Sequence, residues 1–294
     1  MVNQNTTKTL DQRIEEDLKD LYNCGALNGE IKAAKKLQGV IADELSTKGM
    51  PGHFSGNRAA LTVLVTLNPG KDAKGADDAL QEEINKLNID DSSGDKFVRS
   101  YIDGKANFGE LILGKNSPQN NPDSFDVKQA LFFKSWMDGG IFSNGFSEDI
   151  RIAVKEVLMN KLQLELIPYC SRNFKMRKKE LFYEYVETLF DEIFSKKRKY
   201  VIFASATFET LFKDKERMKS IGAVVKFENR QYPMQPLLKN DGTPAKTKFN
   251  CTRIWITYKD KEYKAMIAPT FFKQGVAGDL MCQYGKFCYE EYNK

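Results

Sequence analysis

The chain has 294 residues with 41% apolar and 12% aromatic content, enough to bury a sizeable core in one large domain or two small ones. Its 45 basic and 40 acidic residues give a formal charge of +5, which permits nucleic acid as a partner without requiring it. No long apolar run and no secretory signal pattern occurs, so we expect a cytoplasmic protein that does not enter a membrane.

Metal-ligating and nucleophilic residues are sparse in this sequence. The five cysteines are odd in number and form no CxxC pair, and His53 is the only histidine. These counts argue against a zinc site and against a disulfide framework. A Ser-His-Asp or Cys-His mechanism would have to use His53, which we interpret as an ordinary residue of the Gly-rich loop MPGHFSGN. We therefore expect neither a metal nor a cofactor.

Hydrophobic periodicity predicts the elements of the first part of the chain. Apolar residues at three- and four-residue spacings predict helix over residues 10–47, before the loop STKGMPGHFSGN. The continuous apolar run 61–67 predicts a central parallel strand that is covered on both faces. Residues 71–125 are polar and irregular apart from a short helical segment at 77–87. Such a long connection is typical of a functional or mobile segment.

The second part of the chain alternates helices and strands. Helices are predicted at 126–137, 149–160 and 176–195 and at the end of the chain. Two strands are predicted in LQLELIPYCS and in KYVIFASATFETLF, and the second of these runs on into a helix. A basic, Pro-containing excursion follows at 230–248. Two more strands are predicted after it, in TRIWITY and KEYKAMIAPTFF.

This alternation predicts an α/β fold, with three α/β/α layers built around a mostly parallel sheet. Residues 1–50 are expected to form a helical extension packed on a core domain of residues 51–294. In such sheets ligands bind at the carboxyl ends of the strands. Three strands end there in unusual sequences, TLNPG, IPYCS and IAPTFF, which indicates a pocket at that edge.

The first of these sequences places Asn68 at the mouth of the expected pocket. Pro69 would fix the local backbone, and Gly70 would let a ligand approach the chain closely. Asn-Pro-Gly is also a strong turn signal, so a simple transition from strand to turn is the alternative interpretation.

Four segments in this order resemble the uracil-DNA glycosylase superfamily, in particular its mismatch-specific and single-strand-selective branches. Those branches carry Gly-(Ile/Met)-Asn-Pro-Gly after a strand, where this chain has Thr66-Leu67-Asn68-Pro69-Gly70. Their Asn-Tyr-Cys-Pro motif is similar to Pro168-Tyr169-Cys170-Ser171, their Gly-Arg-Phe-Ala turn to Ala204-Ser205-Ala206-Thr207-Phe208, and their His-Pro-Ser-Pro motif to Ala268-Pro269-Thr270-Phe271. The resemblance covers residues 60–290, and the four motifs together are more specific than any one of them.

The resemblance implies a monofunctional DNA glycosylase that flips a nucleotide out of the stack, hydrolyses its N-glycosidic bond and leaves an abasic site. By the family's pattern, Asn68 orients the attacking water. Asp72 would share the catalytic work, although capping the next helix is its more ordinary role. Phe108 would stack on the flipped base, or simply pack in the core. The expected substrate-binding residues are Thr66, Leu67, Pro69, Gly70, Phe108 and Tyr169.

The resemblance also implies DNA as the partner of a monomeric protein. Phe271 or Phe272 would wedge into the duplex, with Thr270 and Lys273 beside it to meet phosphate. The basic segment KMRKK, beyond the second motif, would neutralise the DNA backbone. Its expected DNA-binding residues are Lys175, Arg177 and Lys178.

Differences from the family's motifs narrow the range of expected substrates. Ala268 replaces the His that stabilises the departing uracil, and Pro168 replaces the Asn that reads the pyrimidine edge. Gly70 stands where a Tyr excludes 5-substituted pyrimidines. Together these changes favour a bulky modified cytosine, such as glucosylated hydroxymethylcytosine in phage DNA, and hence antiviral defence. The alternatives are a uracil or mismatch repair glycosylase, a catalytically inactive protein that binds modified DNA, and an unrelated α/β enzyme acting on a nucleotide or sugar.

Overall fold

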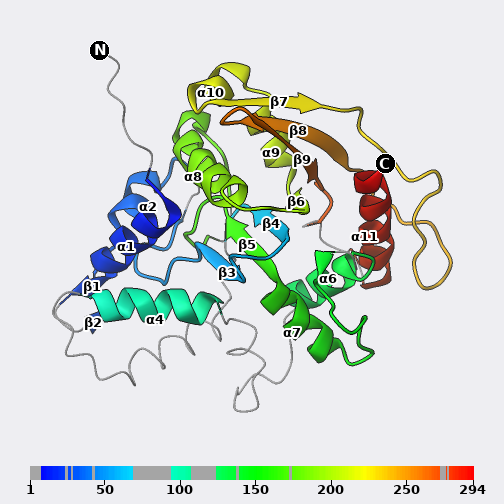
Figure 1. Ribbon diagram of the computed structural model, residues 1–294, viewed down its shortest axis with the longest axis horizontal. Helices are drawn as coiled ribbons and strands as arrows, with labels where there is room; N and C mark the ends of the chain where they lie inside the picture. The colour runs from blue at the N-terminus through cyan, green and yellow to red at the C-terminus, as the bar shows by residue number, and fades with distance from the viewer. Residues whose placement is uncertain are drawn as a thin grey trace. The chain divides into compact units, whose positions relative to one another are not determined.

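The computed structural model describes residues 8–23, 26–27, 29–41, 44–68, 94–106, 124–136, 139–171, 174–271, 276 and 278–294 (Figure 1). The chain divides into two compact units. Unit 1 comprises Met1–Phe54, Leu67–Ala106 and Leu164–Lys196, and unit 2 comprises Ser55–Thr66, Asn107–Gln163 and Lys197–Lys294. This division differs from the predicted boundary after residue 50, because the N-terminal segment shares its unit with two later segments of the chain.

Unit 1 begins with the amphipathic helix α1 (Leu10–Leu21), whose apolar stripe is buried. Thr9 caps the helix: its hydroxyl accepts a hydrogen bond from the Gln12 N–H, while the Gln12 side chain accepts one from the Thr9 N–H. The helix predicted to run to residue 47 ends here, which corrects that prediction. A short antiparallel pair, β1 (Tyr22–Asn23) and β2 (Ala26–Leu27), separates α1 from α2 (Lys32–Leu37).

The other helices of unit 1 are α4 (Asp95–Ala106), the 3₁₀ helix η2 (Lys179–Phe182) and α8 (Tyr183–Phe194). The prediction of a helix at 176–195 is confirmed for its second part. Helix α4 corrects the prediction that 71–125 is irregular around this position, since its buried residues Phe97, Tyr101 and Lys105 recur every four positions. The helix predicted at 77–87 lies outside the described residues.

A seven-stranded mixed sheet runs in the order β3-β5-β4-β6-β9-β8-β7, and most of it belongs to unit 2. The strands are β3 (Phe54–Gly56), β4 (Thr62–Thr66), β5 (Lys161–Glu165), β6 (Tyr200–Phe203), β7 (Ala223–Phe227), β8 (Thr252–Tyr258) and β9 (Lys261–Ile267). β6 is parallel to β4 and to β9, whereas β8 is antiparallel to β7 and β9. Every residue of β4 and β6 is buried, which confirms that β4 is covered on both faces.

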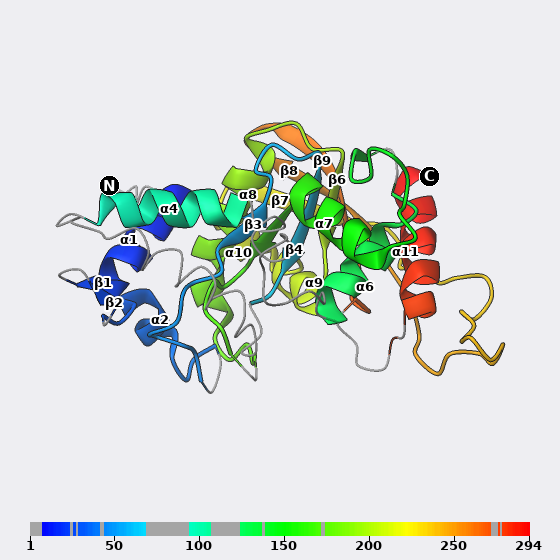
Figure 2. The ribbon, with the colours of Figure 1, turned by 90° about the horizontal axis from the view of Figure 1, so that it is seen from below.

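The helices of unit 2 pack against both faces of its strands. On one face, α6 (Ser124–Phe133), α7 (Ile150–Asn160) and α11 (Gly278–Asn293) share an apolar cluster with Ile202 of β6, and α6 lies beside α11 (Figure 2). The next residue, Phe203, points to the opposite face and contacts Phe208 and Phe212 of α9 (Ala206–Phe212). Helix α10 (Lys215–Ser220) follows and contacts β7.

Gly285 allows α11 to approach α6 closely. A Cβ at this position would lie 1.9 Å from the carbonyl oxygen of Phe132, and the indole of Trp136 donates to the Gly285 carbonyl at 3.1 Å. We expect Gly285→Ala to lower the free energy of unfolding by about 1–3 kcal/mol despite the better helix propensity of alanine. The matched control is Gly278→Ala in the same helix, whose Cβ would meet only the flexible Leu131 side chain. Equal denaturant midpoints for the two variants would contradict this account.

Candidate functional site

The carboxyl ends of β4, β6 and β9 lie side by side in unit 2. Val65, the last but one residue of β4, pairs with Phe203, the last residue of β6, and Phe203 pairs with Ile267, the last residue of β9. The three strands therefore end within one residue of each other. The hydrogen-bonding pattern continues beyond them, because the Ala204 N–H donates to Val65 and the Ala268 N–H donates to Phe203, each at 2.9 Å. The third and fourth sequence motifs therefore begin next to each other at the edge of the sheet where α/β proteins bind ligands.

Asn68 is held by the segment that follows β5. Its side-chain Nδ2 donates to the hydroxyl of Ser171 at 2.9 Å and to the backbone carbonyl of Tyr169 at 3.3 Å. Directly before it, the Leu67 carbonyl accepts from the Ile167 N–H at 2.8 Å. All of these residues belong to unit 1. The first and second motifs, which are about 100 residues apart in sequence, are thus brought together as predicted.

These contacts fix the orientation of the Asn68 amide. A backbone carbonyl can only accept a hydrogen bond, so the NH₂ of the amide must face Tyr169, and both of its hydrogens are directed to protein acceptors. The side chain is only partly buried. An amide oriented in this way can position a small polar group, although it cannot act as a strong base.

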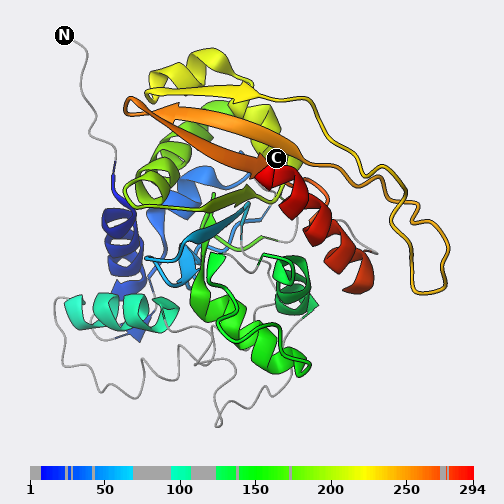
Figure 3. The ribbon, with the colours of Figure 1, turned by 45° about the vertical axis from the view of Figure 1, so that its right-hand side comes forward.

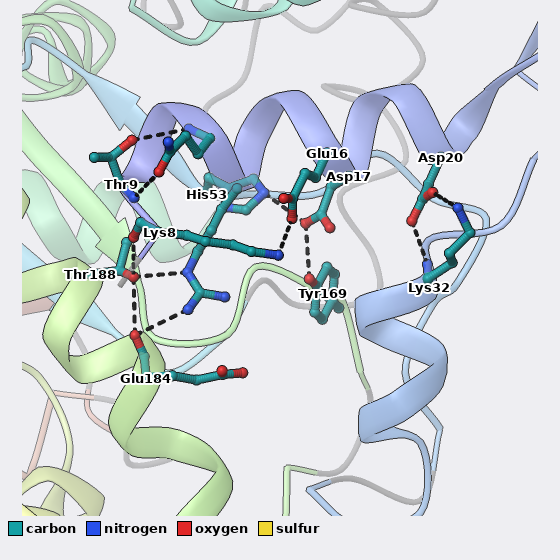
Figure 4. Close-up of polar contacts among 12 residues, drawn as sticks. Lys8, Thr9, Glu16, Asp17, Asp20, Lys32, His53, Tyr169, Glu184 and Thr188 are labelled. Carbon is teal, nitrogen blue, oxygen red and sulfur yellow. Dashed lines mark hydrogen bonds and ion pairs between the residues drawn. The ribbon is translucent and has the colours of Figure 1, made fainter. Parts of the chain in front are cut away.

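The side chain of Tyr169 forms a buried polar network with those of Asp17 and His53 (Figure 4). The Tyr169 hydroxyl donates to Oδ2 of Asp17 at 2.9 Å, and Nε2 of His53 lies 2.9 Å from the same oxygen. Burial, followed by the nearby Tyr185 and Asp17, raises the pKa of Tyr169 far above its usual range, so the phenol remains protonated and donates. Burial also raises the pKa of Tyr185 to about 12, against the opposing effect of Arg13.

This network locates Tyr169 and His53. The Tyr169 side chain is buried against Asp17 of α1, and it is the Tyr169 backbone carbonyl that contacts Asn68. The role of Tyr169 in substrate binding stays a prediction. His53 is likewise buried rather than exposed in its loop. Sequence reasoning missed Asp17, although it falls on the apolar stripe of α1 with Ile14 and Leu21. A carboxylate on a buried helix face is the signal that should have indicated a buried partner.

The fourth motif is buried in unit 2. Thr270 is inaccessible to solvent, and Phe271 is 1% exposed, with its ring against those of Phe125 and Phe132. This placement contradicts the expectation that Thr270 and Phe271 contact DNA. The reason is that the chain turns inward after β9, and the apolar cluster of α6 and α11 takes up the phenylalanine.

The basic segment after the second motif lies against the turn that follows α2. The Lys175 N–H donates to the Ile41 carbonyl at 2.8 Å, and the Arg177 guanidinium donates to the Gly39 carbonyl at 3.1 Å. Lys175, Arg177 and Lys178 are all exposed on unit 1. Their exposure leaves them accessible to solvent, and their contact with DNA stays a prediction.

The remaining expected site residues are Thr66, Leu67 and six others. Thr66 is buried at the end of β4, and Leu67 is partly buried after it. Six residues lie outside the described parts of the chain: Pro69, Gly70, Asp72, Phe108, Phe272 and Lys273. Within the described ranges, no three His, Cys, Asp or Glu side chains gather into a set that could hold a metal ion. None of the helices described combines the length and apolar character needed to cross a bilayer.

Comparisons of the chain with protein-family models, with curated protein sequences and with solved structures find no match.

Proposed function

We propose that this chain is a monofunctional DNA glycosylase with an α/β/α domain of the uracil-DNA glycosylase type. The observation that carries the proposal is the fixed amide of Asn68, held by Ser171 and the Tyr169 carbonyl just beyond the end of β4. The resemblance of four ordered motifs supplies the reaction class, and these contacts bring the first two motifs together. As proposed, the protein is monomeric and cytoplasmic and acts on DNA without a metal or cofactor.

In the proposed reaction, a flipped nucleotide presents its sugar C1′ to a water oriented by Asn68. The glycosidic bond lengthens first, giving an oxocarbenium-like state that needs a positioned water more than a strong base. A neutral amide suits this task, because its oxygen can accept a hydrogen bond from the water without removing a proton. As the water oxygen bonds to C1′ and the glycosidic bond breaks, the proton that the water loses ends on the departing base, which leaves as the free base. Asp72 shares the work in this proposal. The exposed cations of the 175–178 segment bind the DNA backbone.

The proposed leaving group is a bulky modified cytosine. Ala268 offers no side-chain donor to the departing base, and its N–H is already bonded to Phe203. The chain therefore lacks the stabilisation that uracil enzymes obtain at this position, a loss of about 10²–10³ in rate for uracil. The same observation favours a second candidate, a catalytically inactive protein that binds modified DNA.

The proposal is tested by incubating the protein with three DNAs: uracil-containing, hydroxymethylcytosine-containing and glucosylated phage DNA. Base release is read as alkali-labile abasic sites. We expect abasic sites in the glucosylated DNA. Release from uracil DNA alone would instead indicate a repair glycosylase. Tight binding without release from any of the three would favour the inactive binder.

Ser171→Ala tests the support of the Asn68 amide. Removing the hydroxyl leaves one amide hydrogen without its acceptor, so the amide loses part of its fixed orientation. We expect base release to slow roughly tenfold, less than for loss of Asn68 itself, with unchanged affinity for DNA. The control is Ser220→Ala at the end of α10, where the hydroxyl donates to the Arg217 carbonyl at 2.7 Å outside all four motifs, and it should leave base release per folded molecule unchanged.

A further inference from the structure

The long connection between β7 and β8, residues 229–250, forms a projecting arm. It is drawn in yellow to orange in Figure 3, where it extends away from the two strands that carry it. The arm contains the basic, Pro-containing excursion noted in the sequence. It lies entirely in unit 2, and none of the four motifs involves it.

The arm is a structured ribbon anchored on α11. The Leu238 N–H donates to the side-chain oxygen of Gln283 at 3.0 Å, and the Gln283 amide donates back to the Leu238 carbonyl at 2.7 Å. Across the ribbon, the Ala245 N–H donates to the Leu237 carbonyl at 2.8 Å, and both residues pack against the apolar cluster of unit 2. A partner would therefore meet a preorganised surface, with little entropy lost on ordering it.

The arm leaves the sheet at the edge that carries the third and fourth motifs. Because β8 is antiparallel to β9, its first residue, Thr252, pairs with the last residue of β9, Ile267. The Tyr284 hydroxyl donates to the Asn250 carbonyl at the base of the arm and accepts from the Thr270 N–H of the fourth motif, at 2.7 Å and 3.4 Å. One hydroxyl thus ties the arm to the fourth motif.

The surface of the arm combines apolar side chains with cations. Met234 is fully exposed, Tyr232 is 55% exposed and Leu238 is 46% exposed. Three lysines of the arm are also exposed: Lys239, Lys246 and Lys248. Aromatic and thioether side chains interspersed with lysines suit a polyanion with flat apolar bases better than they suit a purely apolar partner.

The two other charged side chains of the arm, Arg230 and Asp241, have partners nearby. Arg230 pairs with Glu209 of α9 at 2.5 Å. The single acidic residue of the arm, Asp241, accepts from the N–H and the hydroxyl of Thr243 in the turn at the tip. The hydrogen bonds from Thr243, with a smaller contribution from Lys239, lower the pKa of Asp241, so this carboxylate keeps its charge. The three lysines outnumber it, and the exposed arm keeps a net positive charge that is complementary to phosphate.

We propose that the arm binds DNA at the carboxyl edge of the unit 2 strands. Lys239, Lys246 and Lys248 contact phosphates of the flanking backbone, while Tyr232 and Met234 pack against sugars or exposed bases. This inference rests on the proposed function, which brings DNA to the carboxyl edge of the sheet.

The test measures the affinity of the full chain for a short fluorescein-labelled DNA duplex over a range of salt concentrations. The variant carries Lys239→Gln, Lys246→Gln and Lys248→Gln. Each lost phosphate contact should make the slope of log K against log salt shallower by about 0.9, or about 2.7 for the three. A second variant, Tyr232→Ala with Met234→Ala, should weaken binding roughly fivefold or more without changing the slope.

The matched control replaces three exposed lysines of unit 2 by glutamine: Lys215 and Lys219 on α10 and Lys261 at the β8–β9 turn. That turn lies at the opposite end of β9 from the fourth motif. The control should keep the wild-type slope. An arm variant with the wild-type affinity and slope would overturn the inference but not the proposed function. A wild-type chain that fails to bind DNA would overturn both. An arm variant altered only in oligomeric state would assign the surface to a second copy and overturn the inference.

Discussion

Replacing Asn68 by alanine is expected to slow base release by roughly 10²-fold or more while leaving DNA affinity nearly unchanged. Alanine removes the amide oxygen that orients the water in the proposed reaction, whereas the cations proposed to bind the DNA backbone are untouched. The amide's own contacts, to Ser171 and the Tyr169 carbonyl, lie in a partly buried position, so their loss should not unfold the chain.

The measurement is single-turnover release of the base, with DNA affinity measured on the same preparations. Asn57→Ala is the control, because Asn57 lies before β4, at the other end of that strand, where its side chain accepts from the Ala59 N–H. The control should release base at the wild-type rate. Unchanged release by Asn68→Ala would remove Asn68 from the reaction, and equal losses of release and of affinity would make it a binding residue.

Replacing Asp17 by alanine is expected to lower the free energy of unfolding of unit 1 by about 2–6 kcal/mol. The change leaves the Tyr169 hydroxyl and the His53 ring without their common acceptor in a buried site. Asp17→Asn keeps the size of the side chain and one acceptor oxygen, so it should cost less. Both variants should also slow base release, since displacement of Tyr169 moves the carbonyl that holds Asn68.

Both tryptophans of the chain, Trp136 and Trp255, belong to unit 2, so tryptophan fluorescence does not report on unit 1. Native-state hydrogen exchange of the amides of α1 and α8 measures the opening free energy of unit 1 directly. Protection of these amides within about 0.5 kcal/mol of wild type in Asp17→Ala would contradict the account of the network.

The elements that were predicted best from the sequence are those in which the local pattern of apolar residues matches their burial in the structure. The apolar run of β4 and the strand-to-helix passage at β6 and α9 follow from continuous apolar residues and from a Ser205 cap. The helix predicted through residue 47 failed because periodicity alone does not detect a hairpin of two-residue strands, which Tyr22 and Leu27 form by pairing.

The features of the candidate site that depend on where strands end could be predicted from the sequence. Those that depend on which side chains pack in the core could not. Asn68 follows a buried strand, and its meeting with the second motif follows from the order of the sheet. The burial of Phe271 could not be read from its neighbours, because two consecutive phenylalanines give no indication of which one the cluster around Phe132 takes up. Asp17 escaped attention because its partners are distant in sequence.

The measurement that tests the central claim most directly is mass spectrometry of the small molecules released from glucosylated phage DNA. The account predicts that the free modified base appears, in amounts equal to the abasic sites formed, and that it is nearly absent with Asn68→Ala. Release of a nucleotide or of the sugar alone, or the absence of any released base while the DNA stays bound, would contradict hydrolysis of the N-glycosidic bond.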